Sequence, residues 1–131
     1  MKKCSLPIDC VIAVTYKCNS RCTMCDIWKI KDFPEFDLSQ INKLPNSLRD
    51  INLSGGEPFL RSDLPQIVEL ISKKIPQARI IISTNGFATE LIVKQMKTIL
   101  KIKPDIGLAL SIDGLGKMHD EIRVIKGGFV K

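Results

Sequence analysis

Aromatic residues and histidine are scarce in this chain of 131 residues. Phe, Trp and Tyr make up 5% of the sequence, and His119 is the single histidine. No aromatic residues alternate with basic ones, which argues against the stacking platform that single-stranded nucleic acid requires. No apolar run is long enough to cross a membrane, and Pro7 and Asp9 interrupt the amino-terminal segment too early for a signal peptide. The sequence therefore predicts a cytoplasmic protein without a membrane partner, and it argues against nucleic acid as a partner.

The excess of positive charge is moderate. Lys and Arg number 20 and Asp and Glu 14, so the net charge is +6. Lys94, Lys97 and Lys101 recur at helical spacing, as on the outer face of a helix. We therefore expect a solvated, Lys-rich exterior, with anionic ligands as the alternative. The apolar fraction of 44% is sufficient for the core of one domain.

The five cysteines are an odd number in a chain without an export signal. This pattern indicates a reducing interior, where clustered cysteines more often hold metal than form disulfides. Cys10 lies in a strand-like run and is expected to be buried, whereas the sequence gives no role to Cys4.

The other three cysteines stand in the segment CNSRCTMC. Cys18, Cys22 and Cys25 have the spacing C-x3-C-x2-C, so one short segment supplies three thiolates. A metal centre held in this way lacks one ligand and can bind a small molecule, and three thiolates on a four-iron cluster leave one iron free. The same spacing also fits one face of a helix, but Asn19 and Ser20 favour a turn.

Strands and helices alternate along the sequence. Strands are expected at 8–15, 51–53, 79–82 and 106–110, and the first has the continuous apolar character of a strand covered on both faces. Helices are expected at 37–44 after a capping box, at 63–71 after a cap by Ser62 or Asp63, and at 89–101. Residues 117–131 give no clear element because Gly127 and Gly128 interrupt them. The alternation predicts an α/β fold with a parallel sheet.

A polar or glycine-bearing segment follows each expected strand: YKCNSRCTMC, SGGEP, STNG and SIDG. Ligands bind outside the carboxyl ends of parallel strands, so these four segments should line one site. In SGGEP, Gly55 and Gly56 let backbone groups approach a ligand and accept a hydrogen bond from an ammonium, beside the carboxylate of Glu57. A plain turn ended by Pro58 is the alternative.

The later segments are weaker on their own. STNG, with Asn85, is also an ordinary turn. Ser111 offers a hydroxyl, and Asp113 offers an acceptor for ribose hydroxyls or a turn-closing carboxylate. His119 is expected at the surface or at a helix cap rather than as a ligand. Arg123 has a rigid fork suited to a carboxylate, or else it is solvated.

Together these segments resemble the radical S-adenosylmethionine superfamily. CNSRCTMC matches the cluster loop of that family, and SGGEP matches its motif for the methionine amino group at the expected separation. STNG, SIDG and HDEIR are similar to further segments of the group that includes molybdenum cofactor biosynthesis proteins and peptide- and sulfatase-modifying maturases. The likeness covers residues 11–123. It implies parallel βα units in a partial TIM-type barrel, with about four of the usual six strands.

The resemblance implies a [4Fe-4S] cluster and S-adenosylmethionine as cofactors. Cys18, Cys22 and Cys25 would bind three irons, and the fourth iron would chelate the amino and carboxylate groups of S-adenosylmethionine. The reaction implied is reductive cleavage to a 5′-deoxyadenosyl radical that abstracts hydrogen from an unknown substrate, with an electron donor such as flavodoxin or ferredoxin as partner. The implied cofactor-binding residues are Gly55, Gly56, Glu57 and Pro58 near the amino group, Ser111 and Arg123 at the carboxylate, and Asn85 and Asp113 near the ribose.

Two features depart from the family pattern. The residue before the third cysteine is often aromatic but is Met24 here, so adenine packing would use its thioether or Trp28. The last two strands of the usual six are missing from the sequence, so we expect a single core domain over residues 1–131 that is truncated at its carboxyl end. The expected strand at 106–110 is then an open edge, which predicts self-association or a C-terminal partner fragment.

Two other functions are compatible with the residues. A zinc module that binds nucleic acid would use the three cysteines with Cys10 or His119, but it leaves SGGEP unexplained. A non-catalytic cluster-binding fragment would keep the fold without the reaction.

Overall fold

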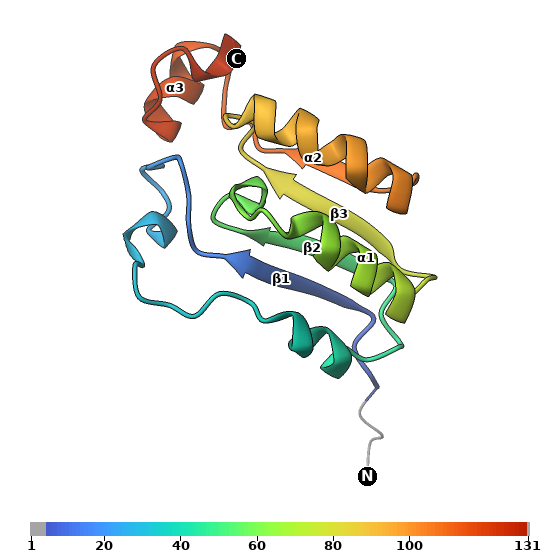
Figure 1. Cartoon of the computed structure of the whole chain (residues 1–131). Helices are drawn as coiled ribbons and strands as arrows, with labels where there is room; N and C mark the ends of the chain where they lie inside the picture. Colours follow the sequence, from blue (N-terminus) through green and yellow to red (C-terminus); the bar gives the residue numbers. More distant parts are fainter. Residues whose placement is uncertain (1–4, 131) are drawn as a thin grey trace.

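The computed structural model describes residues 5–130, so Cys4 lies outside the described part. Its strands form one parallel sheet in the order β1-β2-β3-β4 (Figure 1). This confirms the predicted parallel α/β arrangement, and every strand ends within two residues of its expected range. The elements are β1 (Asp9–Thr15), η1 (Ile27–Lys29), η2 (Leu38–Lys43), β2 (Asp50–Gly55), η3 (Pro58–Leu60), α1 (Leu64–Lys74), β3 (Arg79–Thr84), α2 (Thr89–Ile102), β4 (Gly107–Leu110), α3 (Lys117–Arg123) and η4 (Gly128–Val130).

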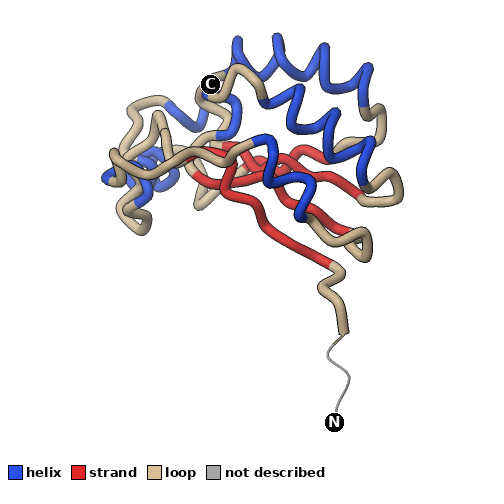
Figure 2. The backbone as a smooth tube through the Cα atoms, turned by 60° about the horizontal axis from the view of Figure 1, so that its bottom comes forward, coloured by secondary structure: helices blue, strands red, loops and turns tan. Residues whose placement is uncertain are grey.

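Helices α1 and α2 cover only one face of the sheet (Figure 2). On that face Ile12, Leu53 and Ile82 are buried in the core, and Cys10 is half-buried, so that burial raises the pKa of its thiol. On the opposite face Val11 is 70% exposed. The prediction that the first strand is covered on both faces is therefore wrong. Successive side chains of a strand point to opposite sides of the sheet, so a continuous apolar run places apolar residues on both faces. Here such residues lie on the uncovered face as well.

Helix α1 follows the predicted pattern, but the predicted side-chain cap is wrong. Asp63 occupies the N-cap position of α1 without a capping hydrogen bond. Its two carboxylate oxygens instead accept from Arg61, each at 2.7 Å. Arg61 also donates to the carbonyl of Val14 at 2.6 Å, so the carboxylate orients a guanidinium that joins α1 to β1.

The capping box predicted at Asp37 and Gln40 is present, although it opens a 3-10 helix. The backbone N–H of Asp37 donates to the side chain of Gln40 at 3.1 Å, and the N–H of Ser39 donates to Asp37 at 2.7 Å. Helix η2 follows and ends before Pro45. The six residues of η2 leave room for only two 3-10 turns.

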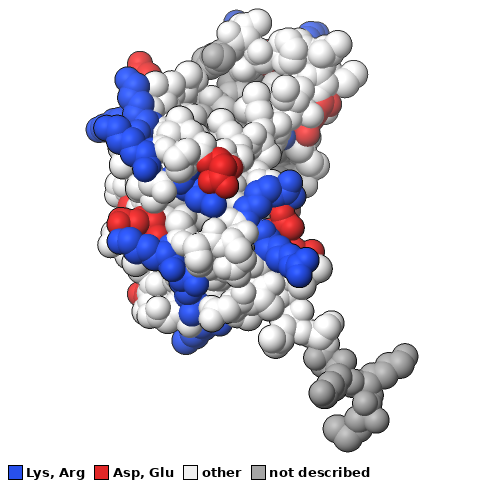
Figure 3. All heavy atoms as spheres, turned by 90° about the vertical axis from the view of Figure 1, so that its right-hand side faces the viewer, with Lys and Arg blue, Asp and Glu red and all other residues white. Residues whose placement is uncertain are grey.

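The exterior is mixed in charge. Lys94, Lys97 and Lys101 are exposed on α2, as their spacing predicts. On the face that Figure 3 shows, basic and acidic side chains are interspersed. Within residues 5–130, no helix combines the length and the apolar character needed to cross a membrane.

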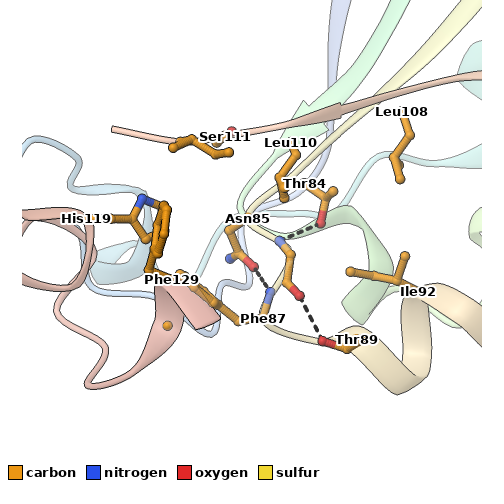
Figure 4. Close-up of a pocket in the computed structure, with 13 residues that line it drawn as sticks. Thr84, Asn85, Phe87, Thr89, Ile92, Leu108, Leu110, Ser111, His119 and Phe129 are labelled. Carbon is orange, nitrogen blue, oxygen red and sulfur yellow. Dashed lines mark hydrogen bonds between the residues drawn. The ribbon is translucent and has the colours of Figure 1, made fainter. Parts of the chain in front are cut away.

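Strand β4 leaves apolar side chains uncovered. Leu108 and Leu110 lie opposite Ile82 and Thr84 in the sheet, and so on the face that the helices cover elsewhere. They are nevertheless 47% and 56% exposed. Both line a cavity of about 360 Å³ that also includes Phe87 (Figure 4). The predicted open edge therefore coincides with an apolar hollow.

We expect the chain to self-associate through this edge, because an unpaired strand beside exposed apolar surface favours pairing with another chain. Replacing Leu108 and Leu110 together by Lys should lower the mass measured by light scattering toward that of a monomer across a concentration series. Leu91→Lys is the matched control, since Leu91 is 42% exposed on α2 and does not line the cavity. A wild-type chain that stays monomeric throughout the series contradicts the expectation.

Candidate functional site

The four strand-end segments meet at one edge of the sheet. Thr15 pairs with Gly55 and Thr84 pairs with Leu110, so the carboxyl ends of the strands lie level. A cavity of about 220 Å³ opens there. The sequence-predicted residues that line it are Cys18, Cys22, Cys25, Gly55, Gly56, Asn85, Ser111 and Arg123.

The three cysteines lie in a loop between β1 and η1, so the alternative of a helix face is wrong. Cys22 is 7% exposed, whereas Cys18 and Cys25 are half-buried, and all three are free thiols. The N–H of Cys25 donates to the carbonyl of Cys22 at 3.2 Å. This turn brings the thiols of one short loop to a common cavity.

Polar groups surround two of the three sulfurs. The N–H of Ser20 donates to Cys18 Sγ at 3.5 Å, and Asn85 Nδ2 donates to the same sulfur at 3.8 Å. Cys22 Sγ lies 3.0 Å from Ser20 Oγ and accepts from Arg123 Nη1 at 3.7 Å. Burial raises the pKa of the Cys18 thiol, and the two N–H donors oppose that shift. Such donors stabilise a thiolate ligand and orient it.

Helix α3 docks on the cysteine loop (Figure 1). The N–H of Thr23 donates to the carbonyl of Ile122 at 2.9 Å, and the hydroxyl of Ser20 donates to the carbonyl of Arg123 at 2.9 Å. The last carbonyls of a helix have no partner within it, so the loop satisfies them. This contact joins residues 103 positions apart, and no local pattern in the sequence signals it.

Asp113 and His119 do not line this cavity. The guanidinium Nε of Arg123, whose side chain is 11% exposed, pairs with the Asp113 carboxylate. His119 Nδ1 accepts from the N–H of Asp113 at 3.2 Å. His119 is 3% exposed and lies 5.9 Å from the ring centroids of both Phe87 and Phe129. The expectation of a surface or capping histidine is therefore wrong. Helix α3 has only seven residues, which are too few for the periodicity of the sequence to show which face is buried.

The two glycines of SGGEP are pressed against the loop after β1. The N–H of Gly56 donates to Thr15 O and the N–H of Glu57 donates to Lys17 O, both at 2.8 Å. An ammonium only donates hydrogen bonds, so Gly55 and Gly56 can meet one through their carbonyl oxygens.

Gly56→Ala should destabilise the chain by about 1–3 kcal/mol, because a Cβ would force backbone apart. That atom would lie 2.1 Å from Lys17 O and 2.6 Å from Lys17 C. Gly107→Ala should cost less, since its nearest neighbour, at 3.0 Å, is a side-chain carbon of Ile81. Urea unfolding of both variants measures the difference, and equal losses would contradict the close approach.

Glu57 is fully buried and is not among the residues that line the cavity. Its carboxylate accepts from Thr84 Oγ1 at 2.9 Å, from the N–H of Asn85 at 2.8 Å and from the N–H of Phe59 at 3.2 Å. Burial raises the pKa of this carboxyl, against the effect of the three donors. Glu57 therefore ties the SGGEP loop to the STNG loop. Pro58 begins η3, is buried, and does not line the cavity either.

Sequence reasoning missed several cavity residues. Ser54, Ser83 and Thr84 also line the cavity, and their signal is their place in the last residues of the strands. Met24, which is 58% exposed, lines the same cavity, whereas Trp28 lines a second hollow of about 520 Å³ that also reaches Cys18.

The potential metal ligands that line this cavity are the three thiols. Within residues 5–130, no three His, Cys, Asp or Glu side chains converge as one metal ion requires. Cys10 and His119, the candidate fourth ligands of a zinc site, do not line the cavity of the three thiols. Cysteine thiolates are the usual ligands of iron-sulfur clusters.

Known proteins resemble this chain over most of its length. The model of the Radical SAM superfamily matches residues 12–129. The chain is 28% identical over 130 residues to the sporulation killing factor maturation protein SkfB of Bacillus subtilis, which covers 95% of this chain and 30% of that protein. It is 34% identical over 128 residues to the Fe-coproporphyrin III synthase of Methanosarcina barkeri, covering 88% of this chain and 30% of that protein.

Solved structures agree with the family match. BtrN in complex with AdoMet and 2-DOIA superimposes with a TM-score of 0.65 at 26% identity, covering 86% of this chain and 48% of BtrN. BtrN in an open conformation gives a TM-score of 0.63 at 27% identity, covering 92% and 56%. The parallel sheet is thus part of a TIM-barrel-like fold, as predicted, and the chain spans 30% of the two curated relatives. By its family match over residues 12–129, the chain belongs to the Radical SAM superfamily.

Proposed function

We propose that Cys18, Cys22 and Cys25 bind a [4Fe-4S] cluster and that S-adenosylmethionine binds beside it. One observation carries the proposal: a single cavity is lined by three thiols together with Gly55 and Gly56. Superfamily members generally bind both cofactors, which supports it. When bound, the reduced cluster supplies the electron that cleaves S-adenosylmethionine to a 5′-deoxyadenosyl radical, which abstracts hydrogen from the substrate.

The chain's own residues would bind and orient S-adenosylmethionine. Carbonyl oxygens of Gly55 and Gly56 accept from its ammonium, while the Ser111 hydroxyl and the Arg123 guanidinium donate to its carboxylate. Asp113 acts by orienting Arg123, to which it is paired. Glu57 and Pro58 act through the conformation of the loop, since neither lines the cavity.

The electron would come from an acidic protein such as flavodoxin or ferredoxin. Arg21 and Lys31 are exposed and line the second hollow, which reaches Cys18. A basic rim beside the cluster loop suits the acidic surface of such a donor, since complementary charge raises the rate of association. The chain spans 30% of the length of these two curated relatives.

Anaerobic reconstitution with iron and sulfide tests the proposal. We expect about four irons and four sulfides per chain, and a four-iron signal in electron paramagnetic resonance after reduction. Incubating the reduced protein with S-adenosylmethionine should release 5′-deoxyadenosine. A cluster without this product would identify a non-catalytic cluster-binding fragment, and tight zinc in a 1:1 ratio would overturn the cluster assignment.

A further inference from the structure

One side chain of the STNG loop reaches across to the cysteine loop. Asn85 is 7% exposed, and its Nδ2 donates to Asn19 Oδ1 at 2.8 Å and to Cys18 Sγ at 3.8 Å. Its Oδ1 accepts from the N–H of Phe87 at 3.0 Å, a bond drawn in Figure 4. Because the oxygen is engaged within its own loop, the amide directs its two N–H groups to the cysteine loop.

The side chain of Glu57 holds the backbone of Asn85 through a hydrogen bond. The buried carboxylate accepts the N–H of Asn85 at 2.8 Å and the hydroxyl of Thr84 at 2.9 Å. That hydroxyl in turn accepts from the N–H of Gly86 at 3.1 Å, which is also visible in Figure 4. A chain of hydrogen bonds therefore runs from the SGGEP loop through Asn85 to the sulfur of Cys18.

We infer that Asn85 raises the reduction potential of the cluster and that Glu57 is its positioning residue; this inference rests on the proposed function. Reduction adds negative charge to a cluster and its thiolates, and an N–H donor to sulfur stabilises that charge. Asn85 is well suited to this task because it is a neutral donor, nearly excluded from water, that comes from a different strand end than its sulfur partner.

This role differs from the ribose contact that the family resemblance implies. Both N–H groups of the Asn85 amide are directed to Cys18 and Asn19, and its oxygen is taken by Phe87. A ribose contact would have to displace one of these bonds, whereas the sulfur contact uses the side chain as it lies.

Redox titration of the reconstituted protein, followed by electron paramagnetic resonance, tests the inference. Asn85→Ala removes the donor, and Asn85→Asp removes it while keeping an oxygen for the N–H of Phe87. In both variants the ratio of reduced to oxidised cluster should be about tenfold lower than in wild type at a fixed ambient potential. For a one-electron couple this corresponds to a midpoint potential lower by about 59 mV. Gln77→Ala is the matched control. It removes an exposed amide that donates to Asn46 O at 2.8 Å, before the first residue of β3, and should leave the midpoint unchanged.

The positioning role of Glu57 has its own test. Glu57 acts on the charge of Cys18, so losing its charge raises the midpoint equally in the wild-type and Asn85→Ala backgrounds. The loss of positioning lowers the midpoint only where Asn85 is present, so the shift caused by Glu57→Gln should be more negative in the wild-type background than in the Asn85→Ala background. Equal shifts in both backgrounds, or no shift in either, overturn the positioning role. Unchanged midpoints in both Asn85 variants overturn the inference while leaving the proposed function intact. Failure of the wild-type chain to take up a cluster instead defeats the proposed function itself.

Discussion

Cys22→Ala should reduce the iron bound after anaerobic reconstitution from about four per chain to nearly none. Two thiolates then remain on the loop, too few to hold a cluster whose fourth iron already lacks a protein ligand. Cys22 is the most buried of the three cysteines, and its Sγ lies 3.0 Å from Ser20 Oγ. The same Ser20 hydroxyl donates to the carbonyl of Arg123 in α3, so Cys22 lies where the cysteine loop contacts α3. Iron and acid-labile sulfide analysis measures the loss.

Cys10→Ala is the matched control for this substitution. Cys10 is also free and half-buried, but it lies in β1, outside the cavity of the three thiols. The variant should retain the wild-type iron content. A cluster lost on Cys10→Ala, or retained on Cys22→Ala, contradicts the assignment of ligands. Circular dichroism of the metal-free proteins checks that both variants are folded.

The positions of the strands and of the loops after them were predictable because both leave short-range signals. β-branched runs mark β3, and the glycines of SGGEP mark a close approach that the contact of Gly56 with Lys17 explains. Parallel pairing then requires the strand ends to converge, so placing Cys18 near Asn85 needed only the order of elements.

What escaped prediction depends on contacts between distant segments. The burial of His119 between two aromatic rings, and the docking of α3 on the cysteine loop, involve partners that no local periodicity reveals. Glu57 stands beside the glycines in sequence, but its side chain is buried against Thr84 and Asn85 and does not line the cavity. The sequence shows that a carboxylate follows the strand, but the side of the loop on which the carboxylate lies depends on tertiary packing.

Glu57→Ala should destabilise the cluster-free chain by about 3–5 kcal/mol, the largest loss that we expect from a single side chain outside the apolar core. Three buried donors, Thr84 Oγ1 and the N–H groups of Asn85 and Phe59, would lose their acceptor, and each such loss costs about 1–3 kcal/mol. Glu57→Gln should cost less, about 1–3 kcal/mol, because the amide keeps one oxygen but turns its NH₂ group toward a donor. Urea unfolding measures both.

Glu69→Gln provides the matched control for the conservative variant. Glu69 lies on α1, is 42% exposed and pairs with Lys73 at 2.5 Å, so losing its charge should change the stability by less than about 1 kcal/mol. A loss at Glu57→Gln no larger than this would contradict the role of the buried carboxylate as a link between loops.

The pH dependence of Glu57→Gln gives a second, independent measurement. Burial raises the pKa of Glu57 in the folded chain above its ordinary value of 4.5, so the folded state holds this proton more tightly than the unfolded state. The stability linked to the proton is fully present below pH 4.5 and is lost as the pH rises through the folded pKa. The advantage of wild type over Glu57→Gln should therefore be greatest at low pH and should shrink toward neutrality. An advantage that grows with pH would mean that the three donors outweigh burial.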